Sequence, residues 1–128
     1  MLRLLDTSVA ILLRDLDPKI TRRVASLDRL PILSVLTVVE LESGVAQAAG
    51  GAKRRQAVDV LLETLEILPF GPDDAAAYGR IVSQLGFSRP KVIDRMIAAQ
   101  AIRVGAALAT LNARDFRDIP GVNLEIWS

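Results

Sequence analysis

The chain has 128 residues, carries a net charge of +1 and is 51% apolar. This length suits one domain with one core, residues 1–128, and the apolar content excludes a disordered chain. The near-neutral charge gives no global basic field that would by itself indicate nucleic-acid binding.

The first half of the chain alternates short apolar segments with segments of helical pattern. Pro18 fits the first turn of a helix, and the pair Gly50-Gly51 is typical of a helix end. We therefore expect, in chain order, a strand at 3–5, helices at 8–13 and 18–29, a strand at 31–35, and helices at 37–49 and 54–66.

The second half continues the alternation and ends on two strands. We expect a strand at 67–70, a helix at 72–86, a loop at 87–92, a helix at 94–104, and strands at 106–110 and 122–127. Strands that alternate with helices are typical of a mostly parallel sheet. The predicted fold is therefore α/β, with a small, mostly parallel sheet flanked by helices on both faces.

The chain contains no cysteine and no histidine, and this absence restricts its chemistry. It excludes disulfides, thiolate catalysis, Ser-His-Asp catalysis and nearly every catalytic zinc site. Catalysis would then rest on carboxylates helped by arginine or lysine, with Mg²⁺ or Mn²⁺ as the metal that oxygen ligands favour. No apolar run is long enough for a membrane span and no signal peptide is visible, so we expect a cytoplasmic protein with no membrane partner.

Four acidic residues are placed where the predicted strands and helices meet. Asp6 follows the first strand, Glu40 lies one helical turn beyond the second, and Asp94 opens the helix that leads into the fourth. Asn112 and Asp115 follow that fourth strand. Ligands of open parallel sheets bind beyond the carboxyl ends of the strands, and gathered carboxylates repel each other unless a cation joins them. The pattern therefore indicates a metal-dependent site for phosphoryl chemistry.

Each of these acids also has an alternative interpretation as a helix cap. Asp6, Asp94 and Asp115 stand near the starts of predicted helical turns, and Thr37 with Glu40 has the spacing of a capping box. Serine or threonine would cap these positions equally well. The joint occurrence of four acids therefore favours the metal site over four separate caps.

A basic segment lies beside one of the four acids. Arg89, Lys91 and Arg95 surround Asp94 in the sequence and are candidates for contacts to the phosphates that flank a scissile bond. Ordinary solvation or pairing with local acids explains such a cluster equally well, so both interpretations stay open.

Four segments together resemble the PIN-domain family, and within it the VapC-like toxins of bacterial toxin–antitoxin pairs. The segment LLDTSVAI resembles the opening strand of the family and the aspartate that follows it. The segment LTVVELESGV resembles the helix that carries the family's glutamate. The segment IDRMIAAQAIRVGAALATLNARDF resembles the family's helix that begins with an aspartate, together with the strand after it. The ending IPGVNLEIW is similar to the C-terminus of the VapC-like toxins. The resemblance covers essentially the whole chain.

The resemblance implies an endoribonuclease that depends on Mg²⁺ or Mn²⁺ and cuts structured RNA of the transfer RNA or ribosomal RNA class. It also implies a homodimer and a co-encoded antitoxin as partners. Whether Asn112 or Asp115 completes the metal site stays open. The implied catalytic and metal-binding residues are Asp6, Glu40, Asp94 and Asp115, and the matching small polar residues are Thr7, Ser8 and Thr110.

Two other functions fit a small α/β domain with acidic residues along one edge. A non-catalytic PIN-like binding module would keep the fold but has no use for the complete set of four acids.

A receiver-type signalling domain needs paired acids after the first strand, an acid after the third and a lysine after the fifth. Here Pro69-Phe70-Gly71 ends the third strand and no lysine follows Lys91, so this alternative is disfavoured.

Overall fold

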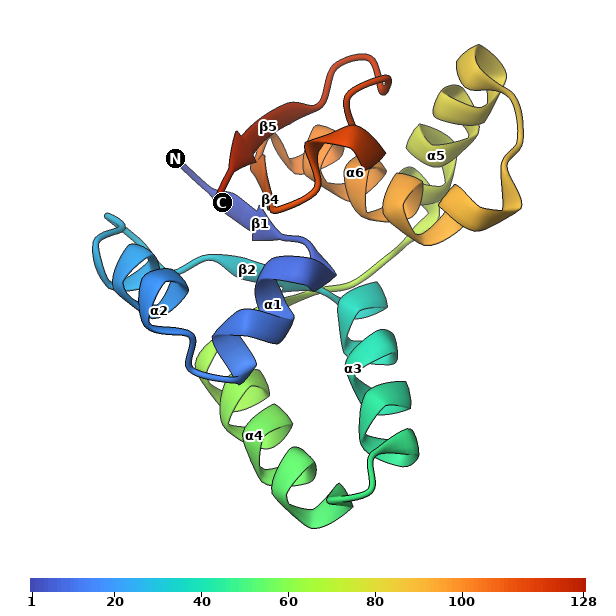
Figure 1. The fold of residues 1–128 in the computed structure, drawn as a ribbon. Coiled ribbons are helices and arrows are strands. Elements are labelled where there is room, and N and C mark those ends of the chain that lie inside the picture. Colours follow the sequence, from blue (N-terminus) through green and yellow to red (C-terminus); the bar gives the residue numbers. More distant parts are fainter.

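Five short parallel strands form the centre of the computed structural model, which describes residues 1–128. In space they follow the order β3-β2-β1-β4-β5, with β1 in the middle (Figure 1). The strands are β1 (Arg3–Leu5), β2 (Ile32–Ser34), β3 (Ile67–Leu68), β4 (Ala107–Thr110) and β5 (Asn123–Ile126). The helices are α1 (Thr7–Arg14), α2 (Pro18–Ala25), α3 (Val35–Gln47), α4 (Gly51–Thr64), α5 (Pro72–Leu85) and α6 (Val92–Val104), with the short 3-10 helices η1 (Arg89–Lys91) and η2 (Ala113–Asp115). None of the helices combines the length and the apolar content that a bilayer span requires.

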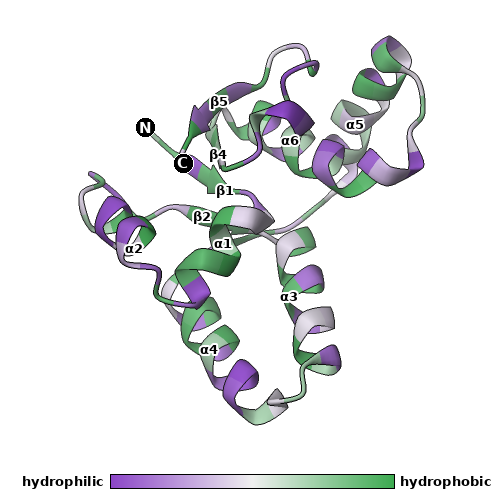
Figure 2. Ribbon diagram, viewed as in Figure 1, coloured by the Kyte–Doolittle hydropathy of each residue, from purple (hydrophilic) through white to green (hydrophobic).

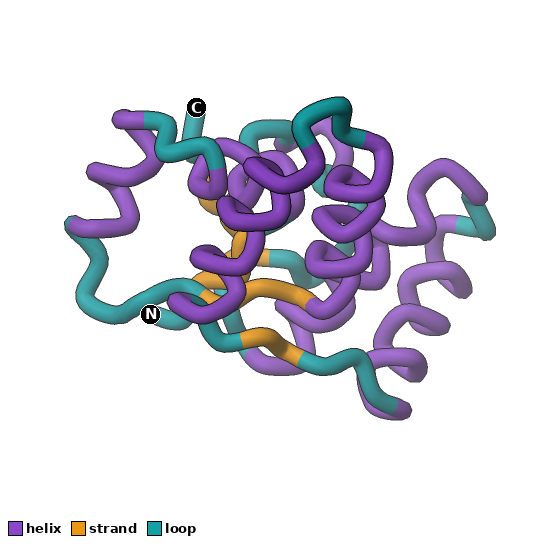
Figure 3. Tube along the Cα trace, turned by 90° about the horizontal axis from the view of Figure 1, so that it is seen from below, coloured by secondary structure: helices purple, strands orange, loops and turns teal.

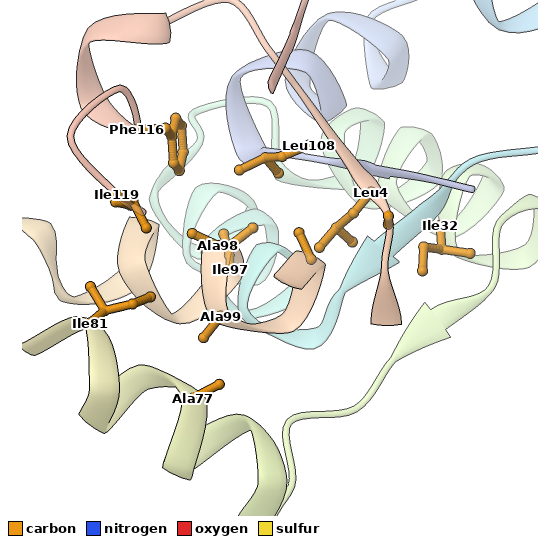
Figure 4. Close-up of a cluster of buried hydrophobic side chains, with 12 residues drawn as sticks. Leu4, Ile32, Ala77, Ile81, Ile97, Ala98, Ala99, Leu108, Phe116 and Ile119 are labelled. Atoms are coloured by element: carbon orange, nitrogen blue, oxygen red, sulfur yellow. The ribbon is translucent and has the colours of Figure 1, made fainter. Parts of the chain in front are cut away.

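Helices cover both faces of the sheet, because neighbouring side chains of a strand point to opposite sides. Leu4 packs into an apolar cluster with Ile81 of α5 and Ile97 of α6 (Figure 4). Leu5, the next residue, packs into a second cluster with α1, α2 and α4. Figure 3 shows the strands in the middle of the molecule with helices around them. The expected α/β fold is confirmed, and every pair of neighbouring strands is parallel.

The order of the strands excludes the receiver-type alternative. Receiver domains have the spatial order 2-1-3-4-5, whereas here β1 lies between β2 and β4. The register pairs Leu4 of β1 with Ile32 on one side and with Leu108 on the other. The carboxyl ends of β1 and β4 therefore lie side by side, and the segments that follow them leave the sheet at the same edge.

Some element boundaries differ from the expected ones. α2 ends at Ala25 rather than at 29, and α4 begins at Gly51 rather than at 54, since Gly50 stands at its N-cap. The expected loop at 87–92 contains the turn η1, and η2 adds a further turn after β4. These differences lie at segment ends, where hydrophobic periodicity carries little information.

The start of α3 differs from the prediction for a reason that concerns Glu40. Ser34 caps this helix, since its hydroxyl oxygen accepts the backbone N–H of Leu36 at 3.0 Å. Thr37 is fully buried inside the helix rather than at its N-cap. The predicted capping box of Thr37 and Glu40 is therefore wrong, and Glu40 is free of that structural role.

Gln100 on α6 is fully buried and joins three elements, a role that the helical pattern does not predict. Its amide nitrogen donates to the carbonyl oxygens of Leu68 and Pro69 at 3.2 and 3.1 Å. Its Oε1 accepts the hydroxyl of Ser34, which in turn caps α3. Gln100 therefore ties α6 to the start of α3 and to the end of β3, and α3 and α6 each carry one of the four candidate acids.

Candidate active site

Asp6 lies at the junction of β1 and α1 and is only 4% exposed. Its carboxylate caps α1 by accepting the backbone N–H of Val9 at 3.0 Å. The same carboxylate accepts the hydroxyls of Ser8 at 2.6 Å and of Thr110 at 2.5 Å. Thr110 ends β4, so this contact crosses the edge at which β1 and β4 lie side by side. The expected cap is confirmed, but a cap alone does not account for the two hydroxyl donors.

Thr110 and Ser8 also fix the segment that follows β4. The hydroxyl oxygen of Thr110 accepts the backbone N–H of Asn112 at 2.9 Å, and that of Ser8 accepts the backbone N–H of Leu111 at 3.3 Å. The side chain of Asn112 is exposed. The two hydroxyls thus connect the Asp6 carboxylate to the loop that carries the remaining candidate residues.

Glu40 on α3 is held to the same edge by a hydroxyl from α1. Its Oε1 accepts the hydroxyl of Thr7 at 2.5 Å, and the hydroxyl oxygens of Thr7 and Thr37 are 3.0 Å apart. Figure 1 shows the first turns of α1 and α3 next to each other. Thr37, which the sequence indicated only as a cap, is thus a supporting residue of this site. Its one signal in the sequence is a hydroxyl one turn before Glu40 in an otherwise apolar stretch.

Asp94 lies in the first turn of α6 and is partly buried. Burial, together with three neighbouring carboxylates, raises the pKa of Asp94 to about 6. In decreasing order of effect these belong to Asp115, Asp6 and Glu40, while Lys91 lowers the pKa. The other three candidate acids thus lie near enough for their charges to act on Asp94, and we refer to these four residues as the acidic edge.

Capping does not explain Asp94 or Asp115. Lys91 stands at the N-cap of α6 and Asn112 at the N-cap of η2, and neither helix has a side-chain cap. Asp94 and Asp115 lie within the helical turns themselves. Of the four acids, Asp6 alone caps a helix.

No cation neutralises the acidic edge. None of its four carboxylates forms an ion pair with an arginine or a lysine. No three acidic side chains converge closely enough to form a finished metal site, and the carboxylates of Asp6 and Glu40 are held by local hydroxyl and amide donors instead. A set of oxygen donors with uncompensated negative charge nevertheless fits a hard divalent cation, which is the ion that such ligands bind best.

The three predicted phosphate contacts differ in their surroundings. Arg95 is only 4% exposed, and its guanidinium donates to the carbonyl oxygen of Gly86 at 2.7 Å. This hydrogen bond links the end of α5 to α6. A guanidinium that is buried and bound in this way is not available to a phosphate in solvent. Lys91 lies 3.9 Å from the carboxylate of Asp118, and Arg89 is exposed without an ion pair.

Comparison with known proteins identifies relatives over most of the chain. A profile of the PIN domain family matches residues 3–122. Ribonuclease VapC2 of Rickettsia felis is 31% identical over 98 residues, which cover 74% of this chain and 72% of that protein. The tRNA(fMet)-specific endonuclease VapC of Salmonella typhimurium is 30% identical over 97 residues, which cover 74% of each.

Solved structures share the whole fold. A chain in the crystal structure of DNA-bound VapBC from Salmonella typhimurium matches with a TM-score of 0.90 at 28% identity, and the match covers 100% of both chains. A chain of VapBC2 from Rickettsia felis, bound to a DNA fragment from its promoter, matches with a TM-score of 0.89 at 25% identity and the same coverage. Sequence profile, relatives and fold agree, and the chain therefore belongs to the PIN domain family, among its VapC-type members.

Proposed function

We propose that this chain is a metal-dependent endoribonuclease and the toxin of a toxin–antitoxin pair. The observation that carries the proposal is the acidic edge, four carboxylates that no cation neutralises. The ribonuclease names of its relatives support RNA as the substrate. A non-catalytic module of the same fold would have no reason to gather carboxylates that repel one another.

The four acids have distinct proposed roles. Asp6 and Asp94 are the main ligands of Mg²⁺ or Mn²⁺, and Glu40 and Asp115 bind the ion directly or through water. Asn112 is the neutral alternative to Asp115 as the fourth group. When bound, such an ion polarises a phosphoryl oxygen and makes a water molecule acidic enough to attack the phosphodiester.

Hydroxyl groups orient the ligands in this proposal. Thr110 and Ser8 each donate to one oxygen of Asp6, and Thr7 donates to Glu40. Oδ2 of Asp6 and Oε1 of Glu40 each accept one hydrogen bond and keep a second lone pair for a cation, whereas Oδ1 of Asp6 accepts two, from Ser8 and Val9. Partners of this kind fix the direction of a metal ligand and are often as necessary as the ligand itself.

The proposed partners follow from the same relatives. The matching structures are VapBC complexes, which supports a cognate antitoxin, and one relative is named for tRNA(fMet). We therefore propose a structured RNA of the transfer RNA or ribosomal RNA class as substrate and a homodimer as the assembly. The whole chain, 1–128, would act as one domain in the cytoplasm.

The test is cleavage of transfer RNA by the purified protein, followed on a denaturing gel. We expect cleavage in Mn²⁺ or Mg²⁺ and none in EDTA. Asp6→Asn and Asp94→Asn should each abolish cleavage, because asparagine keeps the shape but loses the charge that binds the ion. Asp73→Asn, at an exposed position in the first turn of α5, is the matched control and should stay active. Full activity in EDTA would refute the mechanism.

A binding measurement separates the metal site from helix capping. Mg²⁺ should stabilise the folded wild type by about 2.7 kcal/mol at a hundredfold excess over its dissociation constant, and Asp94→Asn should lose most of this gain. If Asp94 were only a structural residue, its removal would destabilise the metal-free protein and leave the response to Mg²⁺ unchanged. Thermal unfolding at fixed ionic strength distinguishes the two cases.

A further inference from the structure

Two exposed arginines lie on either side of Asp115. Arg114 belongs to the η2 turn and Arg117 follows it, and both line one polar hollow together with Asp115 and Asn112. Neither arginine forms an ion pair, although Asp115 and Asp118 are adjacent to them in the sequence. Two uncompensated guanidinium groups are therefore available at the same hollow.

The backbone around the two arginines is fixed. Arg114 lies in η2 and Arg117 lies two residues after its end, and the side chains of both line the same hollow. The backbone N–H of Arg117 donates to the carbonyl oxygen of Ala113 at 2.9 Å and closes the turn. Phe116, which is 1% exposed, anchors the turn in the core. Binding to a preformed turn of this kind requires little further ordering of the backbone.

The hollow lies beside the acidic edge. Asp115, which lines it, is the carboxylate with the largest effect on the pKa of Asp94. The loop after η2 lies against the start of α6, since the carboxylate of Asp118 is 3.9 Å from Lys91 and from Arg95. Figure 2 shows the turn between β4 and β5 as hydrophilic. A polyanion that approaches four carboxylates needs cations close by to offset the repulsion.

We propose that Arg114 and Arg117 bind backbone phosphates of a single-stranded stretch of RNA, next to the bond that is cut. This inference rests on the proposed ribonuclease function and adds residues that contact its substrate. Arginine suits the role, because its planar fork donates two parallel hydrogen bonds to a phosphate and it stays charged at every physiological pH. Arg114 and Arg117 take the place that the sequence suggested for the buried Arg95.

A second basic hollow provides a matched comparison. Lys19 and Arg22, three residues apart on α2, are exposed and line a hollow with Arg3 and Arg23. Arg3 begins β1, so this hollow lies at the opposite end of the strands from the acidic edge. The carboxylate of Glu125 pairs with both Arg3 and Arg23. Removal of Lys19 and Arg22 therefore changes the net charge by the same amount at a distant place.

The experiment compares R114A/R117A with K19A/R22A in the full-length protein. Binding of a fluorescein-labelled oligouridylate is measured by fluorescence anisotropy in EDTA at several salt concentrations. We expect the arginine variant to bind about tenfold more weakly, with a slope of log K against log salt that is smaller by about 1.4, since each single-strand phosphate contact contributes about 0.7. The control variant should keep the affinity and slope of the wild type, and R114K/R117K should fall between them.

Several outcomes would overturn the inference. An unchanged affinity in the arginine variant does so, as does equal weakening in the control variant or no binding by the wild type. A variant that binds RNA normally but no longer binds the antitoxin encoded beside it would assign the arginines to a protein partner instead. Unfolding temperatures equal to that of the wild type show that the variants are folded. A wild type that binds RNA through these arginines but never cleaves it would refute the proposed function alone.

Discussion

Asp94 makes the stability of the metal-free protein depend on pH. Its pKa rises from an ordinary value of 3.8 to about 6 in the folded protein. Between these values the folded state holds a proton that the unfolded state has released, so the free energy of unfolding falls as the pH rises from about 4 to about 6. Asp94→Asn has no such proton and should lose less stability over this range.

Urea unfolding in EDTA at several pH values measures this difference. The control is Asp73→Asn, which leaves the acidic edge intact and should follow the wild type. Identical pH dependence in the wild type and in Asp94→Asn would show that neither burial nor the neighbouring carboxylates raise the pKa of Asp94. The affinity for Mg²⁺ should instead rise with pH over this range. Below about pH 6 Asp94 is protonated, and a protonated carboxyl group is a poor metal ligand.

At the scale of elements, Gln100 determines how the helices that carry the acids are joined. Gln100→Leu keeps a similar volume but leaves the carbonyl oxygens of Leu68 and Pro69 without their donor. The lost hydrogen bonds of this buried group should lower the free energy of unfolding by about 1–3 kcal/mol. Gln84→Leu makes the same change at an exposed position of α5 and should have little effect. Chemical denaturation of both variants measures the difference, and equal effects would show that the Gln100 contacts contribute nothing.

The sequence predicts which helices and strands are present better than it predicts the caps and contacts that connect them. All five strands and the six long helices are present, because each has a clear period or a clear apolar run. The order of Asp6, Glu40 and Asp94 relative to the strands also follows from the sequence, since the carboxyl ends of parallel strands share one edge. The cap of α3 did not follow, because Ser34 and Thr37 are chemically equivalent candidates and only packing decides that Thr37 is buried.

Side-chain surroundings were the least predictable part of the candidate site. Arg95 and Arg114 are both arginines next to an acid, and nothing in the local sequence separates them. Arg95 follows Asp94 on a helix whose other face is the core, so its guanidinium is directed to the carbonyl of Gly86. Arg114 lies on a turn that the buried side chain of Phe116 holds against the core, and the side chain of Arg114 is exposed to solvent. The difference depends on contacts between distant segments.

At the scale of the whole molecule, we expect a homodimer in which α3 lies at the interface. Val39 of α3 is 55% exposed, and apolar surface of this kind is typical of an interface. Val39→Lys places a charge there and should shift the protein toward the monomer. Thr21→Lys, at an exposed polar position of α2, adds the same charge away from exposed apolar surface; it is the control and should remain dimeric. Light scattering at micromolar concentration gives the mass, and a monomeric wild type would contradict the prediction.

The place of β1 in the middle of the sheet has a consequence for synthesis of the protein. β1 pairs with β4, and the hydrogen bond from Thr110 to Asp6 joins residues 104 positions apart. A chain that leaves the ribosome from its N-terminus therefore contains Asp6 and Glu40 long before Asp94 and Asp115. The acidic edge is incomplete on the nascent chain until its last part has emerged. If the acidic edge is the active site, as we propose, the nascent chain has no complete site for RNA cleavage until its synthesis is nearly finished.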